Sequence, residues 1–149
     1  MPYGASEDAA LLLRLVVAAA LAAAVGWERE RAGKSAGFRT HMLVGLAAAL
    51  YTALGVLAME HAAAAPGLRA DPVRVIQSVA LGIGFLGGGA IAASRSDGQP
   101  AHLTTAASIW TTAAVGMAAG VGHYVLAVGA TVLQFIVLRA LARFDLPRS

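Results

Sequence analysis

The chain has 149 residues, of which 58% are hydrophobic and 13% are charged, and its mean hydropathy is +0.71. Soluble domains carry about 25% charged residues, so this composition leaves too little polar surface for a protein that faces water on all sides. The absence of cysteine excludes disulfide bonds, thiolate metal sites and thiol catalysis. The net charge of +3 does not indicate nucleic-acid binding, because the basic residues stand at the ends of apolar runs, as in membrane proteins.

Five apolar runs predict five transmembrane helices, at about residues 9–26, 41–59, 73–93, 103–120 and 123–142. Each run is close to the roughly 20 residues that cross a bilayer as a helix, and none alternates as a barrel strand would. We expect the first run to be retained rather than cleaved as a signal peptide, because a strongly charged segment follows it. We therefore predict one domain over residues 1–149, an all-α integral membrane protein built as a bundle of five transmembrane helices.

The distribution of Lys and Arg predicts the orientation of this bundle. Eight of the eleven basic residues fall in the first loop, the third loop and the C-terminal segment, namely Arg29, Arg31, Lys34, Arg39, Arg95, Arg139, Arg143 and Arg148. Three fall toward the other side, Arg14, Arg69 and Arg74. By the positive-inside rule, the N-terminus lies outside and the C-terminus lies in the cytoplasm.

The loop between the first two runs carries charges of alternating sign, followed by polar residues at the start of the second run. The residues are Glu28, Arg29, Glu30, Arg39, Thr40 and His41. Thr40 is a plausible helix N-cap. Pairing of Glu28 or Glu30 with Arg39 would form a polar cluster that binds an ion or a partner. The alternative is a solvated loop that sets orientation and contacts anionic lipid.

Polar residues also mark the start of the third run. Asp71, Arg74 and Ser78 lie on one helical face, and Pro72 suits a first helical turn. An Asp71–Arg74 pair that caps the helix is one interpretation. The other is an external vestibule for a cation, with Gln77 and Ser78 one turn deeper.

Small residues follow the spacing that close helix packing requires. Gly84 and Gly88 form a GxxxG motif in the third run, and Gly116 and Gly120 form one in the fourth. They indicate close packing of the third span on the fourth, or of one protomer on another. A helix break at residues 87–89 that exposes carbonyls to an ion is the alternative.

Hydroxyl side chains line one face of the fourth run. Thr104, Ser108, Thr111 and Thr112 follow the spacing i, i+4, i+7 and i+8. Such hydroxyls bond to their own helix or to a neighbouring helix, and a polar path is the alternative.

Two absences bear on function. No acidic residue lies in the middle of a predicted span, where a proton- or sodium-coupled carrier usually places one. The sequence contains no P-loop, HExxH or GxSxG motif, so we expect no enzymatic activity and no ATP-driven pumping by this chain alone.

Three blocks of the chain together resemble the MgtC/SapB family of bacterial inner-membrane proteins. They are GWERERAGKSAGFRTHMLVGL (26–46), ADPVRVIQSVALGIGFLGGGAI (70–91) and HLTTAASIWTTAAVGMAAGVGHY (102–124). The resemblance implies a short form without the C-terminal soluble domain of MgtC-type members. It also implies an oligomer in the inner membrane that serves magnesium homeostasis and adaptation to low magnesium or to a host.

Two mechanisms are compatible with this resemblance. In the first, the protein is a regulator that binds another membrane complex, and ATP synthase is the partner that the family implies. In the second, the protein is itself a channel or transporter for magnesium. The missing mid-span carboxylates favour the first mechanism.

We place a candidate site where the glycines of the third span meet the hydroxyl face of the fourth, with Glu28, Arg39 and Asp71 framing its ends. Mg²⁺ is the one cofactor considered, with Glu28 and Asp71 as its candidate ligands. The candidate functional residues are Glu28, Arg29, Glu30, Arg39, Thr40, His41, Asp71, Arg74, Gly84, Gly87, Gly88, Thr104, Thr105, Ser108 and Trp110.

Overall fold

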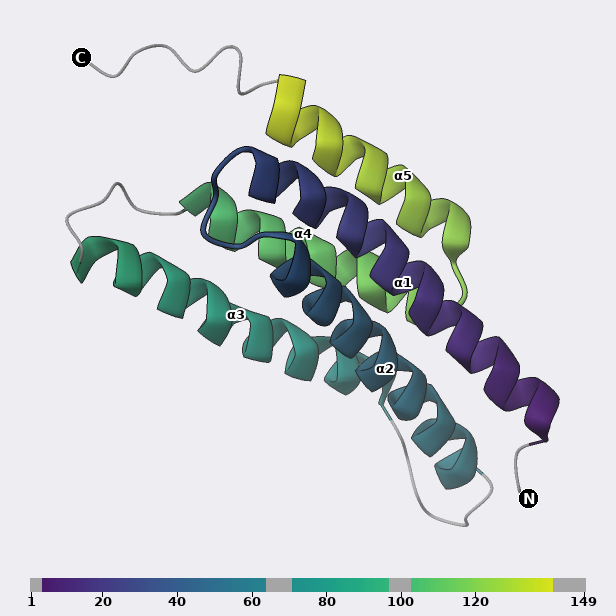
Figure 1. The fold of residues 1–149 in the computed structure, drawn as a ribbon. Helices are drawn as coiled ribbons and strands as arrows, with labels where there is room; N and C mark the ends of the chain where they lie inside the picture. Colours follow the sequence, from purple (N-terminus) through teal and green to yellow (C-terminus); the bar gives the residue numbers. More distant parts are fainter. Residues whose placement is uncertain (1–3, 64–70, 97–102, 141–149) are drawn as a thin grey trace.

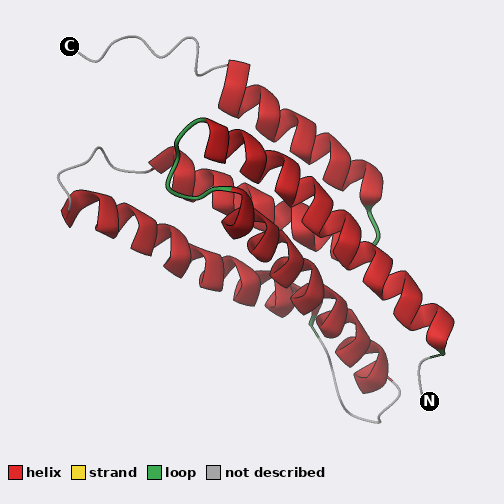
Figure 2. Cartoon of the chain, viewed as in Figure 1, coloured by secondary structure: helices red, strands yellow, loops and turns green. Residues whose placement is uncertain are grey.

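The computed structural model describes residues 4–63, 71–96 and 103–140, and all regular structure in these residues is helical (Figures 1 and 2). The elements are α1 (Ala5–Arg31), α2 (Phe38–Ala63), α3 (Pro72–Ser96), α4 (Leu103–Gly120), α5 (Tyr124–Phe135) and a π-helical segment η1 (Ile136–Ala140). The predicted all-α class is confirmed for the described residues. The predicted end of the last helix at residue 142 lies outside them, as do Arg69, Arg143 and Arg148.

The first helix runs beyond the apolar segment that predicted it. It continues through the charged residues to Arg31, and Arg29 and Arg31 in its last turn complement the helix dipole. It ends where Gly33 adopts a left-handed conformation with φ 66°. The N–H of Lys34 then donates to the Arg29 carbonyl over 3.0 Å, which closes the glycine-dependent helix end known as a Schellman motif.

α1 and α2 form an antiparallel hairpin whose contact uses glycines. A Cβ on Gly26 would lie 2.8 Å from the Cα of Phe38, and a Cβ on Gly45 would lie 2.6 Å from the Cβ of Ala22. At these positions a side chain would force the helices apart, so glycine sets their separation.

α4 is the central helix of the bundle, since it packs against each of the other four (Figure 1). Its buried apolar residues belong to two clusters. Ile109 and Ala113 pack with residues of α2 and α3, and Val115 and Ala119 pack with residues of α1, α2 and α5.

α3 lies at the edge of the bundle. It packs against α2 and α4, on the side away from α1 and α5 (Figure 1). Val79 and Ile83 are its buried large side chains, whereas Leu81 and Phe85 are 79% and 83% exposed.

α5 returns along α4 after a tight turn. Gly122 has φ 85°, and the N–H of His123 donates to the Ala118 carbonyl over 2.9 Å. α4 and α5 therefore form an antiparallel hairpin.

The outer surface of the bundle is apolar, as expected of a protein in lipid. Large hydrophobic side chains from every helix are exposed, among them Val16 at 63%, Leu43 at 65% and Val125 at 90%. Among the described residues, α1, α2 and α3 contain segments long and apolar enough to cross a membrane, and residues 124–140 form a shorter apolar helix. The chain is therefore a membrane protein.

Candidate functional site

A cluster of buried polar side chains lies inside the bundle, at the end where α2 and α4 begin. His41 is fully buried there. One of its ring nitrogens lies 3.0 Å from the Gly37 carbonyl oxygen and the other lies 3.2 Å from Ser108 Oγ. A neutral ring with its proton on Nδ1 satisfies both contacts, because Nδ1–H then donates to Gly37 and Nε2 accepts from the Ser108 hydroxyl. The alternative acceptor of that hydroxyl is the Thr105 carbonyl at 2.8 Å.

Gln134 extends this cluster to α5. Its Nε2 donates to the Ser108 carbonyl over 2.9 Å and to Thr112 Oγ1 over 3.1 Å, which fixes the orientation of the amide. Its Oε1 is buried and has no hydrogen-bond partner among the described residues. Gln134 also lines a groove of about 320 Å³ between α4 and α5, together with Thr104 and Thr111. A buried acceptor without a partner is costly, so this oxygen is a candidate contact for a ligand or a water molecule.

A buried ion pair, Arg29 with Glu28, lies at the same end of the bundle. Arg29 donates to both carboxylate oxygens of Glu28, from Nε to Oε2 and from Nη2 to Oε1, the latter over 2.8 Å. The side chain of Arg29 is 4% exposed and that of Glu28 is 13% exposed. Nη2 also lies 3.4 Å from the Leu138 carbonyl oxygen in η1. A π-helical turn redirects backbone carbonyls, and here a buried arginine from α1 reaches one of them.

Of the two alternatives for this loop, the pairing of Glu28 or Glu30 with Arg39 is not observed. Glu28 binds the neighbouring Arg29, and Oε2 of Glu30 accepts the backbone N–H of Phe38 over 2.8 Å. Arg39 is exposed. Glu30 satisfies a backbone N–H at the start of α2 that has no partner within the helix, and Glu28 is engaged by Arg29.

Thr40 as the N-cap of the second span is also wrong. α2 begins two residues earlier at Phe38, and Thr40 lies exposed in its first turn. The Glu30 carboxylate supplies the capping acceptor from α1, which a local sequence pattern does not reveal.

At the opposite end of the bundle, Asp71 caps α3, but no ion pair with Arg74 accompanies this cap among the described residues. Its Oδ1 accepts the N–H of Val73 over 2.9 Å, and Pro72 is the first residue of the helix. Arg74 and Ser78 are exposed, and Ser78 Oγ donates to its own helix at the Val75 carbonyl. The structure therefore gives Asp71 a capping role.

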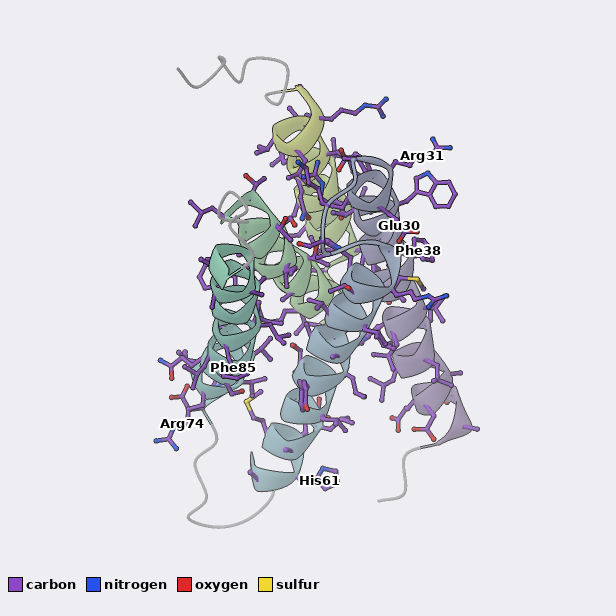
Figure 3. The ribbon with its side chains drawn as sticks, turned by 60° about the vertical axis from the view of Figure 1, so that its left-hand side comes forward. Glu30, Arg31, Phe38, His61, Arg74 and Phe85 are labelled. Carbon is purple, nitrogen blue, oxygen red and sulfur yellow. The ribbon has the colours of Figure 1, made fainter. Side chains whose placement is uncertain are left out.

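The two candidate magnesium ligands do not share a site. Glu28 lies near Glu30 and Arg31, and Asp71 lies near Arg74, at the other end of the bundle in Figure 3. Within residues 4–63, 71–96 and 103–140, no group of three or more His, Cys, Asp or Glu side chains is placed to hold a metal ion.

The predicted packing of the third span on the fourth is observed, but the two GxxxG motifs do not form that contact. A Cβ on Gly116 would lie 3.0 Å from the Cα of Gly45, and one on Gly120 would lie 2.6 Å from the Ala49 carbonyl oxygen. The fourth-span motif thus packs on α2. Around Gly84 and Gly88 of α3, an added Cβ would meet no atom within 4 Å in the described structure.

The glycine run of α3 reaches α4 at one point. A Cβ on Gly87 would lie 3.5 Å from the Cβ of Ala106, and Trp110 Nε1 donates to the Ala80 carbonyl over 3.4 Å. The hydroxyls of α4 are divided between two faces. Thr105, Ser108 and Thr112 are buried, whereas Thr104 and Thr111 are exposed. The buried hydroxyls of Ser108 and Thr112 face α2 and α5, so they do not form one site with the glycines.

Sequence reasoning missed two polar residues in apolar segments. Arg14 of α1 donates from Nη1 to the Gly120 carbonyl over 3.2 Å, where it complements the negative end of the α4 dipole. Gln134 stands inside the last apolar run. A polar side chain within such a run is the signal that would have found both residues.

Comparison with protein families places these features in a known group. The model described as "MgtC family" matches residues 15–146. No solved structure matches the chain.

Three curated relatives show how the similarity is distributed. The "Putative magnesium transporter YhiD" of Escherichia coli (strain K12) is 40% identical over 136 residues, covering 87% of this chain and 60% of YhiD. "Protein MgtC" of Salmonella typhimurium (strain LT2) is 34% identical over 122 residues, covering 82% and 48%. "Protein SapB" of Bacillus subtilis (strain 168) is 32% identical over 117 residues, covering 78% and 50%. The chain thus spans about half to three fifths of the length of these relatives.

Proposed function

This chain belongs to the MgtC family, and on that premise we propose that it is a non-catalytic regulator in magnesium homeostasis. It acts in the bacterial inner membrane by binding a second membrane complex, of which ATP synthase is the candidate that the family resemblance implies. The name of the relative YhiD, a putative magnesium transporter, supports the link to magnesium.

All five helices cross the membrane in this proposal. α4 has 18 residues and the helix over residues 124–140 is shorter still, yet the two are joined by a tight turn and pack on longer helices. The basic residues support a cytoplasmic location for the end of the bundle that carries the loop between α1 and α2. The N-terminus is then outside.

The observation that carries the regulatory proposal is the outer face of α3, formed by Leu81, Gly84, Phe85 and Gly88. These residues recur at helical spacing and all are exposed. The glycines of the GxxxG motif in α4 pack against the backbone of α2. At the glycines of the motif in α3, an added Cβ would lie more than 4 Å from every atom of the other described helices. Helices in a bilayer associate through close packing, because lipid tails are as apolar as the helices themselves. Exposed glycines allow the backbone of another helix to approach closely, so this face suits a partner helix.

The buried charges also support regulation over transport. The Glu28 carboxylate is engaged by the guanidinium of Arg29 through two hydrogen bonds. It is therefore compensated within the protein, and a cation would have to displace Arg29 to reach it.

Co-purification with ATP synthase from bacterial inner membranes tests this proposal. We expect the double variant Gly84→Leu/Gly88→Leu to keep its fold, since both positions are open, and to lose the complex. Gly129→Leu on α5 is the matched control, because a Cβ there also meets no atom within 4 Å. Retention of ATP synthase by the double variant at the level of the control would overturn the role of this face.

Direct magnesium transport is the second candidate, and the buried Oε1 of Gln134 favours it. The neighbouring oxygens are hydroxyls and backbone carbonyls, which suit an ion that keeps part of its hydration shell. A transporter would lose magnesium uptake in Gln134→Leu, whereas a regulator would not take up magnesium at all.

A further inference from the structure

The exposed end of the α1–α2 hairpin carries basic residues that form no ion pair with an acidic residue in the part of the chain that the structure describes. Of the four basic residues in residues 27–40, Arg29 is buried and paired with Glu28. Arg31, Lys34 and Arg39 are all exposed. The other acidic group of this segment, Glu30, accepts the N–H of Phe38 and forms no ion pair with these three residues. The three exposed cations are therefore available to an external anion.

Two aromatic residues stand beside these cations. The Arg31 guanidinium lies 4.9 Å from the centroid of the Trp27 ring, and Phe38 meets that ring edge-on at 6.1 Å between centroids. Trp27 is 54% exposed and directly follows the apolar run of α1. Tryptophan in such a place is typical of the boundary between the hydrocarbon and the headgroups of a bilayer. A guanidinium stacked on a ring also keeps its N–H edge free for a phosphate.

The backbone holds this surface in a defined shape. The Schellman turn at Gly33 positions Lys34 next to the end of α1. Gly37 lies against Glu30, since an added Cβ would come within 2.6 Å of the Glu30 carboxylate. Figure 3 shows Glu30, Arg31 and Phe38 gathered at one end of the bundle, with Arg74 at the opposite end. The cations thus sit on a short, internally bonded connection, and binding an anion requires little ordering of the backbone.

From this arrangement we propose that the α1–α2 hairpin end binds the phosphate of an anionic phospholipid. Arg31, Lys34 and Arg39 supply the charge, and Trp27 and Phe38 lie along the upper acyl chains. A lipid fits this surface better than a soluble anion, because the cations adjoin an exposed aromatic pair at the end of an apolar helix. This site is separate from the outer face of α3 and does not depend on the function proposed above.

Native mass spectrometry of the full chain with phosphatidylglycerol tests the proposal, with phosphatidylcholine as the neutral comparison. Each cation near an anionic surface contributes about a fivefold gain in binding, so Arg31→Gln/Lys34→Gln/Arg39→Gln should bind phosphatidylglycerol about 100-fold more weakly. Lys34→Gln alone should lose about fivefold, which keeps the test valid if the triple variant does not fold. Arg74→Gln, at the other end, should stay within twofold of the wild type. Binding by the wild type should also weaken as salt is raised.

Three results would overturn the proposal. The first is equal binding of phosphatidylglycerol by the triple variant and the wild type. The second is displacement of the lipid by millimolar inorganic phosphate, which would identify a site for free phosphate. The third is protection of the protein against heat by polyglutamate to the same degree as by phosphatidylglycerol, which would indicate an acidic protein partner.

Discussion

A methyl group added at Gly116 should destabilise the bundle far more than one added at Gly88. The new Cβ of Gly116→Ala would lie 3.0 Å from both the Cα and the carbonyl carbon of Gly45, and closer still to its carbonyl oxygen. These are backbone atoms, so they can yield only if α2 and α4 separate. Overpacking of this kind costs about 1–3 kcal/mol. The better helix propensity of alanine offsets at most about 1 kcal/mol of that cost.

The matched control is Gly88→Ala, where the new Cβ meets no atom within 4 Å. We expect it to be neutral or slightly stabilising. The assay is thermal unfolding of purified protein in detergent, followed by the loss of the monodisperse peak in size-exclusion chromatography. A lower melting temperature for Gly116→Ala alone supports the close packing of α2 and α4. Equal melting temperatures for the two variants would refute the reasoning.

Three further substitutions test the buried polar groups by the same unfolding assay. Glu28→Ala leaves Arg29 buried without its carboxylate, so we expect a loss of about 3–5 kcal/mol; a stability equal to wild type would show that the pair is solvated. His41→Ala removes a fully buried ring that bridges two helices, at an expected cost of about 2–4 kcal/mol, and a change below 1 kcal/mol would contradict its place in the core. Arg14→Ala removes the donor to the Gly120 carbonyl and should cost about 1–2 kcal/mol; Arg14→Lys should recover part of this, and no recovery would argue against a charge effect.

The sequence predicted the helices well where a local signal marks their ends. Asp71 followed by Pro72 is both a cap and a first turn, and α3 begins there. The break between the fourth and fifth apolar runs, at residues 121–122, coincides with the turn at Gly122. The first apolar run predicts a helix end at Gly26, whereas α1 continues for five more residues to Arg31. The length of an apolar run reflects the thickness of the membrane. The end of a helix depends instead on where its last backbone carbonyls find hydrogen-bond partners.

The candidate site was harder to predict, because it depends on which helices meet. The spacing of residues along each apolar run predicted which hydroxyls and glycines share a face of their own helix. It did not reveal that α4 lies parallel to α2 and directs Ser108 to His41, nor that Gly116 packs on Gly45. The pairing of Glu28 with its neighbour Arg29 is likewise a tertiary effect, since burial against η1 draws the arginine inward.

Magnesium uptake into proteoliposomes that contain only this chain tests most directly whether it acts through a partner. Folded wild-type protein should admit no more magnesium than empty vesicles do, and Gln134→Leu should behave in the same way. Selective magnesium uptake by the wild type, abolished in Gln134→Leu and retained in Gly129→Leu, would contradict the regulatory function and establish the chain as a transporter.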